Sequence, residues 1–142
     1  MKRLSTLWIP ILSCALVLGC SSSTEAAASL VSGNWVSADT YTGMENGTIA
    51  NLRVSIDPVA DPSVLTGSWS LGTNTGDIDD GGLSGNAIPL VLEGKFYNDG
   101  VSLTGTVSSD AIVGTLNGNF GSNFGAERWA FNGTTVTLRR GF

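Results

Sequence analysis

A short apolar–x–Gly–x–apolar pattern recurs along this chain of 142 residues and constrains its fold more than any other feature. The six clear copies are Val31-Gly33-Trp35, Leu65-Gly67-Trp69, Leu92-Gly94-Phe96, Leu103-Gly105-Val107, Ile112-Gly114-Leu116 and Leu116-Gly118-Phe120. Side chains two residues apart lie on the same face of a β-strand, so each glycine falls on the apolar face. A residue without Cβ there lets the strand bend and lets the opposite wall of a narrow barrel come close. The repeat therefore predicts a small coiled β-barrel.

The rest of the chain consists of similar short segments, in which apolar and polar residues alternate and which Gly, Asn and Asp residues separate. Asn46-Gly47, Asn98-Asp99-Gly100 and Asn132-Gly133 are typical of hairpin turns. We expect strands at about 33–39, 48–57, 64–71, 88–97, 101–108, 111–120, 125–131 and 134–140, and a long loop at residues 72–87. The predicted fold class is all-β: a small antiparallel up-and-down barrel of about eight strands, with a β-sandwich as the alternative.

Three motifs resemble the calycin barrels, the group that includes lipocalins and avidins. They are Gly33-Asn34-Trp35 near the start, Leu65-Thr66-Gly67-Ser68-Trp69 in mid-chain and Thr135-Val136-Thr137-Leu138-Arg139-Arg140 at the end. The resemblance implies that Trp35 packs inside the closed end of the barrel and that Arg139 or Arg140 caps it. Biotin binding is not implied, because the first strand lacks the Asn that follows the tryptophan in avidins.

The N-terminus has the pattern of an export signal. Lys2 and Arg3 precede an apolar run over residues 7–18, which is too short for a stable membrane span. The run ends in Val17-Leu18-Gly19-Cys20, which resembles the lipobox of bacterial lipoproteins. The resemblance implies cleavage before Cys20, lipidation of Cys20 and a lipid-anchored protein of the bacterial cell envelope, at the outer rather than the inner membrane in a Gram-negative host.

Other interpretations of this segment stay open. Ala26-Ala27-Ala28 offers an ordinary signal-peptidase site that would release a protein starting at Ser29, and an uncleaved apolar helix is a third reading. With the lipobox placed first, the chain divides into a signal peptide (1–19), a lipidated Cys20 with a flexible tether (20–32) and a β-barrel domain (33–142).

Composition excludes several function classes. Removal of the signal takes away Lys2 and Arg3, so the formal net charge goes from −5 to −7. Such a surface repels nucleic acid, which is therefore not an expected partner. The chain has no histidine, so Ser-His-Asp and Cys-His catalysis and the usual zinc and copper sites are excluded. We expect no catalytic residues, no enzymatic activity and no cofactor.

Two residue sets remain as candidate sites. Asp77, Asp79 and Asp80 beside Gly81 and Gly82 could hold Ca²⁺, although they lack a complete loop motif and a solvated turn is the better reading. The second set, the aromatic side chains of the strands, could fill the barrel or line a ligand cavity: Trp35, Trp69, Phe96, Phe120 and Trp129.

Two functions follow. The first is an anchored barrel that binds a small apolar ligand in its lumen. The second is a structural or protein-interaction lipoprotein whose barrel is filled by side chains. A packed lumen would favour the second.

Overall fold

The computed structural model describes residues 29–58, 61–94, 99–121 and 127–141, and it is a closed eight-stranded antiparallel barrel. The wall strands are β1 (Gly33–Ser37), β4 (Arg53–Ile56), β5 (Gly67–Leu71), β6 (Asn74–Gly81), β7 (Ala87–Gly94), β8 (Gly100–Val107), β9 (Ala111–Phe120) and β10 (Trp129–Arg140). Each pairs with its neighbour in this order, and β1 closes the ring by pairing with both β4 and β10. The predicted up-and-down barrel is confirmed, and the sandwich alternative is wrong.

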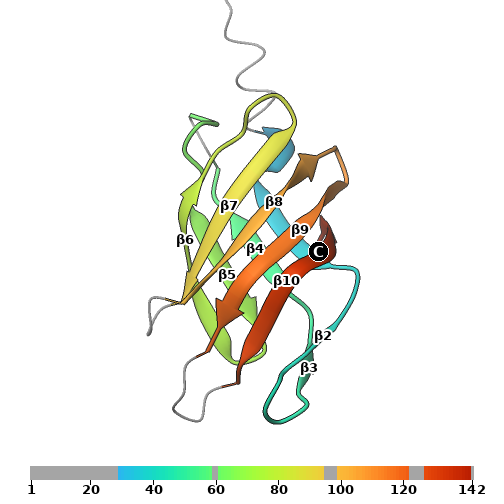
Figure 1. Cartoon of the computed structure of the whole chain (residues 1–142). Helices are drawn as coiled ribbons and strands as arrows, with labels where there is room; N and C mark the ends of the chain where they lie inside the picture. The colour runs from blue at the N-terminus through green and yellow to red at the C-terminus, as the bar shows by residue number, and fades with distance from the viewer. Residues whose placement is uncertain (1–28, 59–60, 95–98, 122–126, 142) are drawn as a thin grey trace, which may run out of the picture.

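The two ends of the barrel differ (Figure 1). At the closed end, a helical turn at residues 29–31 leads into β1, and β10 finishes beside it. At the opposite end, called the hairpin end below, β2 (Tyr41–Thr42) and β3 (Ile49–Ala50) form a separate two-stranded hairpin between β1 and β4. Within the described residues, no helix has the length and apolar character needed to cross a membrane.

The core follows the alternation expected from the sequence. Leu52, Val54 and Ile56 point inward, as do Leu90 and Leu92. Inward residues of neighbouring strands meet in rows, so their apolar side chains fill the lumen together. The alternation of apolar and polar residues along the strands is therefore enough to predict which residues form the core.

One correction concerns residues 72–87, where the structure has strand β6 rather than a long loop. Leu71 pairs with Asn74, so β5 and β6 are joined by the two-residue turn Gly72-Thr73. The inward positions of β6 include Gly76 and Gly81, which leave space for side chains of other strands. Because these positions carry no apolar side chain, β6 lacks the alternation that identifies a strand.

A second correction concerns the C-terminus, where the two expected strands are the single strand β10. Asn132-Gly133 is not a hairpin turn but a β-bulge, since the register with β9 shifts between Asn132 and Thr134. Gly133 has φ +63°, a conformation that glycine adopts both in turns and in bulges. Asn-Gly alone does not distinguish the two. The count of eight strands is right because this error offsets the missed β6.

Smaller departures affect the other expected elements. The run 48–57 is divided into β3 and β4, and Asn46-Gly47 lies in the turn of the β2–β3 hairpin. Asn98 and residues 95–97 of the expected strand 88–97 lie outside the described residues, as do residues 125–126. Residues 29–32, assigned to the tether, belong to the packed domain: Val31 is fully buried.

Candidate functional site

The closed end is built around the side chain of Arg140, at the end of β10. Its Nη1 donates to the Ser32 carbonyl at 2.9 Å, and its Nη2 donates to the Leu30 carbonyl at 2.6 Å. The guanidinium carbon lies 4.5 Å from the centre of the Trp35 ring. The indole of Trp35 donates to the Val31 carbonyl at 2.8 Å. The resemblance allowed Arg139 or Arg140 in the capping role, and the structure gives it to Arg140.

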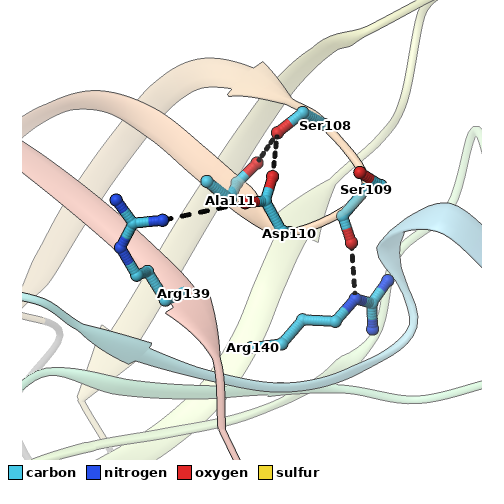
Figure 2. A network of polar contacts seen from close by, with 6 residues as sticks. All are labelled: Ser108, Ser109, Asp110, Ala111, Arg139 and Arg140. Atoms are coloured by element: carbon cyan, nitrogen blue, oxygen red, sulfur yellow. Dashed lines mark hydrogen bonds and ion pairs between the residues drawn. The ribbon is translucent and has the colours of Figure 1, made fainter.

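The same guanidinium reaches a third segment, the turn between β8 and β9. Arg140 Nε donates to the Ser109 carbonyl at 2.9 Å (Figure 2). Arg139 points to the other side of this turn and forms an ion pair with Asp110 at 3.8 Å, with both side chains largely exposed. Exposed pairs of this length add little stability. Arg140 is therefore the residue that joins the chain entry, the β8–β9 turn and the last strand.

The predicted ligand-lining residues that the structure describes lie in the interior, and two of them, Trp69 and Phe120, stack on each other. Trp35, Trp69, Phe120 and Trp129 are at most 3% exposed, while Phe96 lies outside the described residues. Trp69 of β5 stacks on Phe120 of β9 with ring centres 3.8 Å apart. Since β5 and β9 are four strands apart in either direction around the ring, this pair crosses the full width of the lumen.

Gly76 makes room for this stack. A Cβ at Gly76 would lie 2.7 Å from Trp69 Nε1, and it would also collide with the Glu93 carbonyl oxygen. The Trp69 indole passes over this glycine and donates to the Glu93 carbonyl at 2.9 Å. The Trp69 side chain therefore occupies lumen space that a side chain at position 76 of β6 would otherwise take.

Burial of the other inward side chains extends this picture along the barrel. The fully buried ones, with no solvent-accessible surface, include Leu52, Leu71, Ile88, Leu92, Leu103, Ile112, Leu116, Val136 and Leu138. Any of these bordering a cavity large enough for water would retain accessible surface. The interior that they line is therefore packed by side chains.

The hairpin end is held by Glu127, which precedes β10. Its Oε2 accepts from the Thr73 backbone N–H at 3.1 Å, and its Oε1 accepts from Asn46 Nδ2 at 3.5 Å. The Glu127 carbonyl accepts from Asn74 Nδ2 at 2.8 Å. The hydrogen bond from Thr73 is the main reason that the pKa of Glu127 lies below its ordinary value. One carboxylate thus connects β10, the β5–β6 turn and the β2–β3 hairpin.

Beneath this connection lie two polar atoms without a partner in the described part of the chain. They are the Tyr41 hydroxyl and the Trp129 indole nitrogen, both inaccessible to solvent. The Tyr41 ring packs edge-on against Phe131 with centres 5.3 Å apart. Burial raises the pKa of Tyr41, and the Asp39 carboxylate raises it further. Polar atoms left unpaired in this way cost stability.

The other predicted sites have different outcomes. Asp77, Asp79 and Asp80 lie on strand β6, all exposed, and not in the expected loop. Across the described ranges, no group of three His, Cys, Asp or Glu side chains is placed to hold a metal ion. Cys20 lies outside the described residues, so its lipidation stays a prediction.

A groove of about 430 Å³ lies on the outer face of β1, β4, β5 and β6. Two rows of outward side chains border it: Val36, Arg53, Ser70 and Thr75 in one, and Asn34, Ser55, Ser68 and Asp77 in the other. Between the two rows, four residues at inward positions of the strands form the floor of the groove: Trp35, Val54, Trp69 and Gly76.

Sequence reasoning missed this groove and the role of Glu127. The groove depends on the register of four strands, one of which was not expected. Glu127 gave no signal, because an isolated carboxylate in the expected strand 125–131 has the pattern of an ordinary exposed charge.

Comparison of the chain with protein-family models, curated proteins and solved structures found no match. Function is therefore inferred from the geometry of the barrel and its surface.

Proposed function

We propose that this protein is a lipid-anchored, calycin-like barrel of the bacterial cell envelope that acts through its outer surface as an interaction module. The contact of Arg140 with Trp35 supports the calycin-like assignment. The lipobox-like segment ending at Cys20 supports the anchor and the location. Of the two functions expected from the sequence, this is the second.

The observation that carries the proposal is the Trp69–Phe120 stack across the lumen. A carrier of an apolar ligand needs an enclosed space of about 300 Å³ or more. Here the space between the opposite walls holds protein side chains, and the inward residues along the barrel are buried against each other. The groove of about 430 Å³ lies outside.

The anchor also sets an orientation for the barrel. Arg140 holds the carbonyls of Leu30 and Ser32 at the closed end. The nine residue steps from Cys20 to Ser29 span at most about 30 Å when extended. The closed end would therefore face the membrane, and the hairpin end and much of the outer wall would be available to a partner.

Titration with N-phenyl-1-naphthylamine, an apolar fluorescent probe, tests the filled lumen. We expect no saturable fluorescence with the wild type. We expect Phe120→Ala to bind benzene, measured as a rise in its thermal stability that the wild type does not show, because loss of this ring leaves a dry apolar cavity of about one ring beside Trp69. Phe120→Leu serves as a milder variant in case the first does not fold, and Val113→Ala on the outer wall is the control. Stoichiometric binding by the wild type that Phe120→Ala removes would contradict the proposal.

A further inference from the structure

The groove on β1, β4, β5 and β6 carries one charge of each sign. Arg53 lies in one bordering row and Asp77 in the other, and both are exposed. Among the residues that the structure describes, neither side chain has an ion-pair or hydrogen-bond partner. The groove thus offers a guanidinium for a carboxylate and a carboxylate for an ammonium group.

The spacing of these charges follows from the strand register. Arg53 is on β4 and Asp77 is two strands away on β6, which separates them by about 10 Å at the usual strand spacing. They also differ by one row, which adds about 7 Å along the strands. The two Cα positions are therefore about 12 Å apart. An extended peptide of three residues spans about 10 Å, so its two charged ends fall within reach of side chains that extend from these two Cα positions.

The surface between the charges is neutral and rich in hydroxyl groups. Ser68, Ser70 and Thr75 have no side-chain hydrogen bond within the described ranges, whereas Ser55 donates to Asn34 at 2.9 Å. Free hydroxyls both donate and accept, as a peptide backbone requires. The groove offers no aromatic face to a sugar ring, because its two tryptophans, Trp35 and Trp69, are buried.

We propose that this groove binds a short zwitterionic peptide of about three residues, with its carboxylate on Arg53 and its amino group on Asp77. A zwitterion also avoids the repulsion that the acidic chain exerts on an anion. This inference rests on the proposed function, since it supplies a ligand class for the outer surface of a filled barrel.

Calorimetric titration of the full-length protein in mild detergent with tri-alanine tests the site. We expect saturable binding in the millimolar range, weakened about fivefold by Arg53→Gln and about fivefold by Asp77→Asn, as for exposed charge pairs. Capping both ends of the peptide as N-acetyl-tri-alanine amide should weaken binding about twentyfold. Arg139→Gln and Asp80→Asn change the same charges outside the groove and should leave the affinity unchanged.

Several results would overturn the inference: no binding of tri-alanine, equal affinity for the capped peptide, or equal losses in the control variants. Binding of maltotriose in place of tri-alanine would show a saccharide site and would also overturn it. These results can be told apart from a failure of the proposed function, because the naphthylamine titration measures binding inside the barrel and the tri-alanine titration measures binding in the outer groove.

Discussion

The closed end and the hairpin end of the barrel are each fastened by one charged side chain that joins its own segment to two others. At the closed end, the Arg140 guanidinium donates to backbone carbonyls on residues 29–32 and on the β8–β9 turn, and it covers Trp35. At the hairpin end, Glu127 accepts one backbone N–H and one amide side chain. The Arg140 guanidinium has several N–H donors in one rigid planar group, whereas the Glu127 carboxylate only accepts hydrogen bonds. The partners of Arg140 are backbone carbonyls, whereas one of the two Glu127 partners is a side chain.

The two ends also differ in how well buried polar atoms are satisfied. The Trp35 indole N–H has the Val31 carbonyl as its acceptor. At the hairpin end, the indole N–H of Trp129 has no acceptor among the described residues. The Tyr41 hydroxyl has no hydrogen-bond partner among them either. Local opening begins where such contacts are poorest, so we expect the hairpin end to open more readily than the closed end.

The largest effect is expected for Gly105 and Gly114, which pair on β8 and β9 toward the closed end. A Cβ on Gly105 would lie 2.9 Å from the Gly114 Cα and would collide with the Val113 carbonyl. The obstacle is thus the neighbouring strand, and not the opposite wall that the sequence suggested. Gly105→Val and Gly114→Val should each lower the free energy of unfolding by about 3 kcal/mol.

Denaturant melts check this value, with Thr104→Val and Thr115→Val as controls. These threonines are adjacent, exposed and paired with each other. Valine suits a strand, so we expect changes within about 0.5 kcal/mol. Equal losses in the glycine and threonine variants would refute the close approach of β8 and β9.

A smaller loss, about 2 kcal/mol, is expected for Arg140→Met, since it leaves carbonyls of residues 29–32 without their donor and removes the cation from the Trp35 face. Arg139→Met is the matched control on the next residue and should cost less than about 0.5 kcal/mol, because its ion pair with Asp110 is exposed. Thermal or urea unfolding measures both. If the two variants lose the same free energy of unfolding, the stabilising contacts assigned to Arg140 are contradicted.

At the hairpin end, Glu127→Gln should cost about 0.5–1 kcal/mol, because the amide accepts hydrogen bonds more weakly than the exposed carboxylate does. Hydrogen exchange localises the effect: the Thr73 amide should exchange faster, whereas the amides of β8 and β9 should not change. Faster exchange throughout the barrel would show that the two ends are not independent.

The same residue predicts a pH dependence. The pKa of Glu127 is lowered from 4.5 in the folded state, so the carboxylate contributes stability above that value. This contribution is lost as pH falls below 4.5 through the folded pKa. The difference in unfolding free energy between wild type and Glu127→Gln should therefore shrink over this acidic range. A difference that stays constant from pH 6 to pH 3 would contradict the role of the charge.

The smallest effect is expected for Tyr41→Phe. This change removes a buried hydroxyl without a partner in the described chain and keeps the ring against Phe131. Unfolding free energy should stay the same or rise by up to about 1 kcal/mol. A loss above 1 kcal/mol would show that the hydroxyl has a partner.

The sequence contained enough to predict the barrel, the inward faces and the contact of Trp35 with a late arginine. These depend on local alternation or on a motif that the resemblance supplied. Strand β6 could not be predicted, because Gly76 and Gly81 occupy positions where a strand normally shows apolar side chains. The bulge at Asn132-Gly133 has the same residue pattern as a turn.

The outer groove and the Glu127 contacts lay beyond sequence reasoning for a different reason. Arg53 and Asp77 are 24 residues apart, and only the register of β4, β5 and β6 brings them to one groove. Glu127 meets Thr73 and Asn46 through segments that are distant in the chain. Such sites are products of topology and not of a local pattern.

The most direct test of the filled barrel is native mass spectrometry of the protein purified from its own host in a mild detergent. We expect a single species, with the mass of the chain from Cys20 and its acyl groups and no retained apolar molecule. A second species, heavier by one small apolar molecule and absent in a Phe120→Trp variant, would show that the lumen holds a ligand and is not filled by side chains.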